Sequence, residues 1–312
     1  MRIAVVGAGA IGGFIAAALA RSGTDVAVVA RGAHLDAIQR RGITLVSSDL
    51  GPFTAKVEAS SDLRSLGTFD VVFAAFKAHQ WPGLAQQFEH LSRTPTQIVT
   101  LQNGVPFWYV REPPLKSVDP DGRLGARFGD EQIIGAVVHV SGHIVEPGRI
   151  HQSGGTRYLF GAPGGGTTDR IETLLSALSW AELHPEVDEN IRSTVWLKLV
   201  NNVGLNSTST LHRLTMRQLL GRASTRNEAR TLMEETLHVG QALGVVEEVD
   251  IEARLAYAER LADVKTSMLQ DFEAGRPLEL DPILGAVVEL AERLGVDVPH
   301  VRQAYEQLAT HR

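Results

Sequence analysis

The chain has 312 residues, of which 44% are hydrophobic and 21% are charged, a balance typical of a globular protein with one or two domains. The net charge of −6 gives no electrostatic reason to expect nucleic acid or an anionic membrane as a partner. The lack of cysteine excludes disulfides and cysteine-ligated metals. The 11 histidines show no spacing typical of a metal site, so we expect no bound metal.

The N-terminal stretch predicts a strand, a glycine turn, a helix and a second strand. An apolar run over residues 3–6 precedes a G-x-G-x-x-G spacing, and a second apolar run covers residues 26–30. In this context the glycines are typical of a dinucleotide-binding fold, in which the pyrophosphate lies at the helix N-terminus. The cofactor-binding residues predicted here are Gly7, Gly9, Ala10, Ile11 and Gly12.

The same stretch has two competing interpretations, because residues 3–20 carry no charge. A secretory signal peptide or a membrane-spanning helix could also begin in this way. The four glycines in the stretch and the strand pattern after it argue against both. We therefore expect a cytoplasmic protein.

Arg31 follows the second predicted strand, where an NAD-binding site usually carries an acidic residue that accepts from the ribose 2′-hydroxyl. No acid occurs over residues 26–35. A guanidinium binds a 2′-phosphate that a carboxylate would repel. The sequence therefore predicts NADP rather than NAD, although Arg31 could also be a solvated loop charge.

The next segments alternate between helix and strand patterns, which predicts a doubly wound parallel sheet. We expect a helix over 33–41 and strands over 43–46, 52–57, 69–76 and 97–101. Lys77 and Asn103 follow the last two strands, and ligands of such sheets bind at the carboxyl ends of the strands. Each residue alone could be an ordinary loop residue, but their shared placement with Arg31 favours a ligand site.

Residues 111–130 are rich in proline, glycine and charge and predict a long loop, which is either a lid or contact surface or a solvated insertion. A strand over 133–140 and a hairpin around Pro147-Gly148 follow, and a strand over 158–161 ends the predicted sheet region.

Helical periodicity replaces the strand patterns from about residue 189. We expect helices over 190–206, 225–243 and 250–274, one capped by Asp281, and a last one opened by Pro299. The sequence thus predicts a Rossmann-type α/β domain over 1–188 and an all-helical domain over 189–312, which could bind substrate and form a homodimer.

Lys198, Asn202 and Asn206 are spaced i, i+4, i+8, so in a helix they drift by only about 80° and share one face. The residues around them are almost all apolar, and buried polar groups need partners. These side chains either satisfy one another or line a cleft that binds a polar ligand. Because burial lowers the pKa of a lysine, Lys198 would then be a suitable proton donor near neutral pH.

With these motifs the sequence resembles the ketopantoate reductase (2-dehydropantoate 2-reductase) family over nearly its whole length. The matching pieces are GAGAIG, Arg31, the FK pair ending at Lys77, LQNG with Asn103, VEPGRI, KLxxNxxxN, TSMLQD, and GRPLELD with Glu279. The resemblance implies a Rossmann domain, a helical domain, and NADPH-dependent reduction of 2-dehydropantoate to (R)-pantoate, a step of pantothenate biosynthesis.

The resemblance also implies a role for each matching residue. Lys198 would polarise the substrate carbonyl and donate its proton, and Glu279 would support the lysine. Lys77 and Asn103 would meet the cofactor near the nicotinamide ribose. The substrate-binding residues would be Asn202, Asn206 and Ser267.

One departure from the family pattern is Val264, which stands where well-understood members have an asparagine. A site that loses one amide could prefer a different keto acid. Three alternatives therefore stay open: a reductase of this family with another 2-keto acid, a 3-hydroxyacid or opine-type dehydrogenase, and a non-catalytic NADP-binding sensor.

Overall fold

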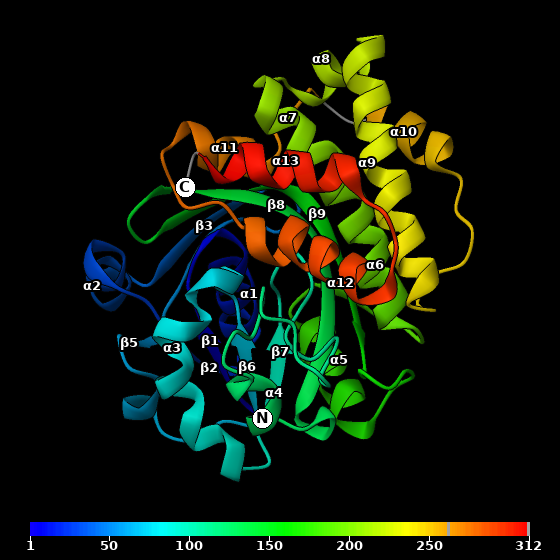
Figure 1. Ribbon diagram of the computed structural model, residues 1–312. Coiled ribbons are helices and arrows are strands. Elements are labelled where there is room, and N and C mark those ends of the chain that lie inside the picture. Colours follow the sequence, from blue (N-terminus) through cyan, green and yellow to red (C-terminus); the bar gives the residue numbers. More distant parts are fainter. Residues whose placement is uncertain (261–262, 311–312) are drawn as a thin grey trace. The chain divides into compact units, whose positions relative to one another are not determined.

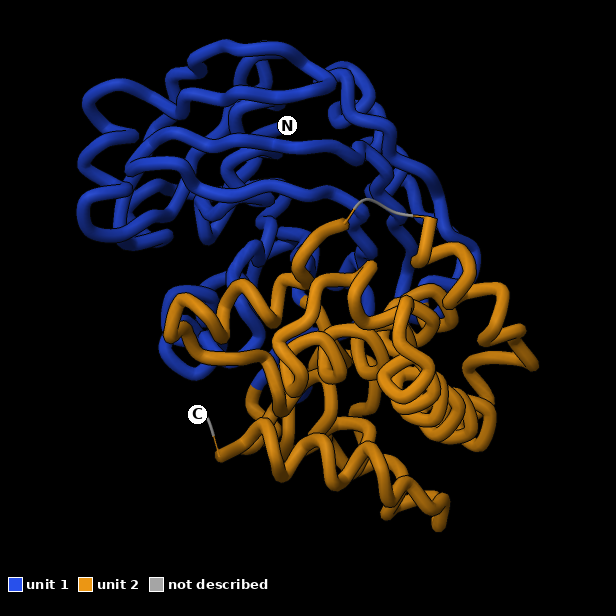
Figure 2. The backbone as a smooth tube through the Cα atoms, turned by 90° about the horizontal axis from the view of Figure 1, so that it is seen from above, with its two compact units in different colours: residues 1–102, 124–191 blue, residues 103–123, 192–312 orange. Residues whose placement is uncertain are grey.

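The computed structural model describes residues 1–260 and 263–310, and its chain forms two compact units (Figure 2). Unit 1 comprises residues 1–102 and 124–191, and unit 2 comprises 103–123 and the residues from 192 onwards. The chain therefore leaves unit 1, contributes one segment to unit 2, and returns before the second unit is built.

Unit 1 contains a mostly parallel sheet (Figure 1). Its strand order is β4-β3-β9-β8-β7-β6-β1-β2-β5, and β10 pairs with β9. The neighbours from β5 to β8 are all parallel, whereas β8 and β9 form an antiparallel hairpin. The strands are β1 (Arg2–Val6), β2 (Asp25–Val29), β3 (Ile43–Ser47), β4 (Gly51–Ala55), β5 (Glu58–Ser60), β6 (Val71–Ala74), β7 (Gln97–Thr100), β8 (Ile133–Glu146), β9 (Arg149–Gly161) and β10 (His184–Val187). This sheet confirms the predicted fold class. The prediction that the sheet ends with the strand over 158–161 is wrong, because β10 at His184–Val187 also belongs to the sheet.

The helices of unit 1 include α1 (Ala10–Arg21), which packs against β1, β2, β3, β8 and β9. A Cβ on Gly13 would lie 2.2 Å from Ile150 Cδ1, so helix and hairpin approach closely there. The other helices are α2 (Gly32–Arg41), α3 (Trp81–Phe88), α5 (Asp169–Trp180), α4 (Arg123–Arg127), which begins at the last residue of the unit 2 segment, and the 3₁₀ turns η1 (Leu63–Leu66), η2 (Ala78–Gln80), η3 (Glu89–Arg93) and η4 (Asp130–Gln132).

Unit 2 is helical and contains two π-helical segments, η5 (Asn202–Asn206) and η6 (Asp281–Gly285). The segment η5 continues directly from α6 (Ile191–Asn201) and packs against η6. The other helices are α7 (Ser207–His212), α8 (Met216–Leu220), α9 (Ala223–Ala242), α10 (Ile251–Glu259), α11 (Ser267–Glu273), α12 (Ala286–Leu294) and α13 (Pro299–Ala309).

The prediction of one continuous helix over 250–274 is wrong. The helix α10 ends at Glu259, and α11 starts only at Ser267. The side chain of Thr266 accepts the N–H of Leu269 and thereby caps α11, which fixes a new helix start inside the predicted range. Leu261 and Ala262 of that range lie outside the described residues.

The prediction that Asp281 caps a helix is also wrong. Asp281 lies inside a helical stretch, where it follows Leu280 and is the first residue of η6. Its carboxylate accepts a hydrogen bond of 2.6 Å from the hydroxyl of Tyr305 on α13. The Asp281 carboxylate is therefore bound by a side chain from a helix that lies further along the chain.

The segment 103–123 packs with unit 2, unlike the predicted first domain, which ran unbroken over 1–188. Tyr109 is buried, its ring stacks on Trp196 at 5.9 Å between ring centres, and its hydroxyl donates to the carbonyl of Arg192 at 2.6 Å. Glu289 on α12 accepts the backbone N–H groups of Lys116 and Ser117. These bonds dock the first part of the predicted 111–130 loop on the helices of unit 2.

Within the described ranges, no helix has the length and apolar character needed to cross a bilayer.

We expect Gly240→Ala to destabilise unit 2. A Cβ at this position of α9 would lie 2.1 Å from Trp196 Nε1, which donates to the carbonyl of Thr236. Such overpacking costs about 1–3 kcal/mol. Gly83→Ala on α3 is the matched control, since its Cβ would meet nothing within 4 Å, and it should stabilise by roughly 0.5–1 kcal/mol. Urea unfolding followed by circular dichroism measures both, and equal midpoints for Gly240→Ala and the wild type would contradict the packing argument.

Candidate active site

A cavity of about 270 Å³ lies at the carboxyl ends of β1 and β2 in unit 1. Its walls come from the glycine turn, from the end of β2 with the start of α2, and from three further elements. The lining residues are Val6, Gly7, Ala8, Gly9, Val29, Ala30, Arg31, His34, Phe76, Gln80, Leu84 and Ile144. The structure thus brings Gly7, Gly9 and Arg31 of the predicted cofactor site to one cavity.

The glycines of the turn keep this cavity open and the helix close. Gly7 has φ +97°, and a Cβ there would lie 2.6 Å from Ala75 O, so a side chain would be strained and would clash. A Cβ on Gly12 would lie 2.1 Å from Gly7 O, whereas at Gly9 nothing lies within 4 Å. The open space at Gly9, beside the N-terminus of α1, fits a phosphate group that contacts backbone N–H groups.

Of the other predicted cofactor residues, Ala10, Ile11 and Lys77 lie close to this cavity in the chain, whereas Asn103 belongs to unit 2. Ala10 and Ile11 form the first turn of α1, and Arg31 is the exposed residue that precedes α2. Lys77 lies between Phe76 and Gln80, which both line the cavity.

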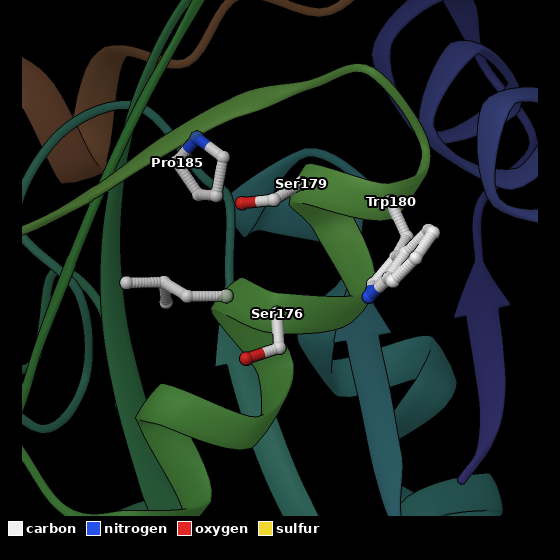
Figure 3. A pocket seen from close by; sticks show the side chains of 5 residues that line it. Ser176, Ser179, Trp180 and Pro185 are labelled. Carbon is white, nitrogen blue, oxygen red and sulfur yellow. The ribbon is translucent and has the colours of Figure 1, made fainter.

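A second pocket in unit 1, of about 610 Å³, is formed by α5 and β10 and is lined by Ser176, Ser179, Trp180 and Pro185 together with Leu175 (Figure 3). Trp180 is 82% exposed. No predicted site residue lines this pocket, and it is lined by no ionisable side chain, so it is not the candidate site.

Lys198 lies in α6 of unit 2 and is partly accessible to solvent. Burial lowers the pKa of its ammonium to about 8, and the negative charge of Glu279 opposes this shift. An amine with such a pKa is largely protonated at pH 7 and gives up its proton more readily than an ordinary lysine.

Asn202 and Asn206 are the first and last residues of the π-helical segment η5. Asn206 Nδ2 donates to Asn202 Oδ1 over 3.4 Å, so the two amides share a face as predicted. In the described part of the chain, Asn202 Nδ2 is buried without a hydrogen-bond partner. Because buried polar atoms rarely stay unsatisfied, this donor points to a ligand or a water molecule.

Glu279 is held by the turn that follows β7. Asn103 Nδ2 donates to Glu279 Oε2 over 3.3 Å. The turn itself is fixed by the N–H of Val105, which donates to the carbonyl of Pro282 over 2.7 Å, and by Gly104, where a Cβ would lie 2.4 Å from the same oxygen. Asn103 therefore belongs to the helical unit and reaches the residue that acts on Lys198.

Ser267 is the exposed first residue of α11, and this helix packs against η5. The structure thus brings the start of α11 to the segment that carries Asn202 and Asn206. Val264 is 48% exposed, and its carbonyl accepts the N–H of Met216 over 3.0 Å.

Across the described residues, no group of three His, Asp or Glu side chains could hold a metal ion.

The sequence analysis missed several residues of these sites. The cavity of unit 1 is also lined by His34, Gln80 and Ile144, and a signal existed only for His34, which follows Arg31 by one helical turn. The π-helical geometry at Asn202 and Asn206 has no signature in the spacing, because the same spacing also fits an ordinary α-helix.

Comparisons with known proteins give one consistent result. The family model Ketopantoate reductase PanE/ApbA matches residues 3–165, and Ketopantoate reductase PanE/ApbA C terminal matches residues 190–312. The chain is 38% identical over 309 residues to the 2-dehydropantoate 2-reductase of Mesorhizobium japonicum, which covers 96% of this chain and 94% of that protein.

Solved structures agree with the sequence relatives. The crystal structure of 2-dehydropantoate 2-reductase from Geobacter metallireducens GS-15 is similar with a TM-score of 0.89 and 29% identity, covering 100% of both chains. The enzyme of the same name from Methylococcus capsulatus gives a TM-score of 0.86 at 29% identity, covering 99% of this chain and 96% of that one.

We expect the Lys198 ammonium to titrate near pH 8, and the Glu279→Gln variant to titrate at a lower pH. Burial disfavours the charged amine and the Glu279 carboxylate favours it, so removal of that carboxylate lowers the pKa further. Carbon NMR of reductively methylated lysines measures both midpoints, and the signal missing from Lys198→Arg assigns the resonance. A midpoint that rises in Glu279→Gln would contradict this assignment.

Proposed function

The chain belongs to the ketopantoate reductase family, and on this premise we propose that it reduces the keto group of 2-dehydropantoate to the hydroxyl of pantoate, with NADPH as the cofactor. The observation that carries the proposal is the amine of Lys198, with its lowered pKa, on the same helical run as the buried Asn202 amide that lacks a partner. Reduction of a carbonyl by a hydride also needs a proton donor for the oxygen and hydrogen-bond donors that hold the substrate, and this helical run carries both kinds of group.

The reduced nicotinamide supplies a hydride when it is bound. In unit 1, the turn at Gly7 and Gly9 and the N-terminus of α1 would hold the pyrophosphate, and Arg31 would bind the 2′-phosphate of the adenosine. Lys77 and Asn103 would contact the nicotinamide ribose.

Lys198 performs the proton transfer in this proposal. Its ammonium donates a hydrogen bond to the keto oxygen and stabilises the negative charge that develops there. It then gives its proton to that oxygen, so the alkoxide becomes the product hydroxyl. A pKa of about 8 keeps the amine charged at neutral pH and still able to release the proton.

Glu279 supports the lysine by its charge. Its carboxylate raises the pKa of Lys198 against the effect of burial, which maintains the protonated acid at neutral pH. Asn103 donates to Glu279 and so fixes the direction of that carboxylate. Asn202, Asn206 and Ser267 would bind the carboxylate and hydroxyl groups of the substrate.

A second candidate substrate class is a 2-keto acid without the terminal hydroxyl of 2-dehydropantoate. The observation that favours it is the exposed aliphatic side chain of Val264, three residues before Ser267. A site with fewer hydrogen-bond donors for a hydroxyl binds a substrate that carries this hydroxyl less tightly.

The homodimer expected from the apolar helical unit remains a prediction.

We expect the purified protein to oxidise NADPH with 2-dehydropantoate, and Lys198→Ala to lower kcat by about 10²–10⁴-fold, the usual contribution of a general acid. NADPH affinity should stay near the wild-type value. Loss of nicotinamide absorbance measures turnover, and titration calorimetry measures affinity. Lys56→Ala is the control, because this exposed lysine lies in unit 1, where it donates to the carbonyl of Arg40.

Three outcomes of that assay separate the candidates. Faster turnover of 2-ketoisovalerate, which lacks the hydroxyl, would favour the second substrate class. Bound NADPH without turnover of any 2-keto acid would favour the sensor. Unchanged turnover in Lys198→Ala would remove this residue from the mechanism.

We expect Arg31→Ala to weaken NADPH binding by about 10- to 100-fold, as the loss of one charge-assisted hydrogen bond predicts, and to leave NADH binding nearly unchanged. Calorimetry with both cofactors measures the effect. The control is Arg40→Ala on α2, the helix that follows Arg31, because Arg40 does not line the cavity. Equal affinity of the wild type for NADPH and NADH would refute the preference for NADP.

A further inference from the structure

We propose that His34 is a positioning residue for the adenosine half of the cofactor, because its imidazole joins the glycine turn to the β8–β9 hairpin. The proposal rests on the proposed function, since it assumes that the cavity in unit 1 binds a dinucleotide. His34 itself lines that cavity together with Gly7, Gly9 and Ile144.

Both ring nitrogens of His34 have a backbone partner. Nε2 lies 2.7 Å from the carbonyl oxygen of Ala8, inside the glycine turn. Nδ1 lies 3.1 Å from the backbone nitrogen of Gly148, in the turn of the hairpin. The two partners are more than a hundred residues apart in the chain, and one side chain links them.

These partners determine the tautomer of the ring. The Gly148 N–H can only donate, so Nδ1 accepts, and the Ala8 carbonyl can only accept, so Nε2 donates. The neutral imidazole with its hydrogen on Nε2 satisfies both bonds at once. Neither the opposite tautomer nor the imidazolium can do so.

The bond to Ala8 orients the peptide that joins Ala8 to Gly9. A trans peptide is planar, so its N–H points opposite to its C=O. When His34 holds the Ala8 carbonyl, it also fixes the direction of the Gly9 N–H. Gly9 is the residue whose surroundings leave room for a phosphate, because nothing lies within 4 Å of a Cβ placed there.

The bond to Gly148 fixes a wall of the same cavity. The hairpin turn also contacts two other residues on this face of α2: Arg41 donates to the carbonyl of Pro147 over 3.3 Å, and a Cβ on Gly148 would lie 3.0 Å from Ala37 Cβ. Docking of the turn holds the nearby strand β8, from which Ile144 lines the cavity although it is 44% exposed. Ile144 is therefore placed to cover an apolar base.

The test uses 2′,5′-ADP, which represents the adenosine half of NADPH, and isothermal titration calorimetry of the full chain. We expect His34→Ala to raise the Kd by about tenfold, which corresponds to about 1.4 kcal/mol. His34→Gln should stay within about threefold of the wild type, since its amide offers one donor and one acceptor. Arg40→Ala is the matched control, because Arg40 is an exposed residue of the same helix that does not line the cavity, and its Kd should not change.

A second readout uses the wild type and does not depend on the folding of His34→Ala. Nitrogen NMR of labelled histidines should show one ring in the Nε2–H tautomer whose signals shift when 2′,5′-ADP is added and are missing in His34→Gln. If His34→Ala fails to fold, this spectrum decides the question.

The outcomes are distinct. An unchanged Kd in folded His34→Ala, or a His34 ring that stays in another tautomer, overturns the inference and leaves the proposed function intact. A wild type that binds neither 2′,5′-ADP nor NADPH overturns the proposed function instead. A weaker complex in His34→Ala with rescue by His34→Gln supports the positioning role.

Discussion

The partial burial of one charged amine, that of Lys198, is the constraint on which the candidate active site depends. Burial disfavours the ammonium, so the surrounding chain must supply compensating charge, and Glu279 does so from the irregular segment just before the helical stretch that contains η6. Asn103 then fixes Glu279, and the carbonyl of Pro282 fixes the turn that carries Asn103. A charge that is removed from water needs its partner in a defined place. The charged state of Lys198 therefore depends on the position of Glu279, which in turn depends on Asn103 and on the turn that carries it.

Much of the fold could be predicted from the sequence where the signal is local. The glycine spacing between two apolar runs predicted a strand, a helix and a second strand, and the structure contains them as β1, α1 and β2. Pro147-Gly148 predicted a hairpin, since few residues adopt the φ of +79° found at Gly148. The i, i+4, i+8 spacing placed Lys198, Asn202 and Asn206 on one helical run, because side-chain direction in a helix follows from the spacing alone.

The errors occurred where a distant partner decides the local structure. Asp281 has the sequence context of a helix cap, but the hydroxyl of Tyr305 takes its carboxylate. The helix pattern over 250–274 is continuous in the sequence, yet Thr266, whose hydroxyl also donates to Ser209 on α7, starts a new helix within it. The position of His34 in the cavity likewise depends on its hydrogen bond with Gly148, and no local sequence pattern predicts this bond. The roles of the cofactor and substrate residues stay predictions until ligand binding is measured.

The interleaved course of the chain has a consequence for folding and for truncated forms of the protein. Unit 1 needs residues 124–191 to be complete, and they follow a segment that packs with unit 2. A fragment that ends at residue 191 would contain Phe107, Trp108 and Tyr109 without the helix that carries Trp196, so three aromatic side chains that are buried in the whole chain would face solvent. During synthesis the same aromatic segment emerges before the C-terminal helices on which it packs, so its apolar surface is covered only after those helices are made.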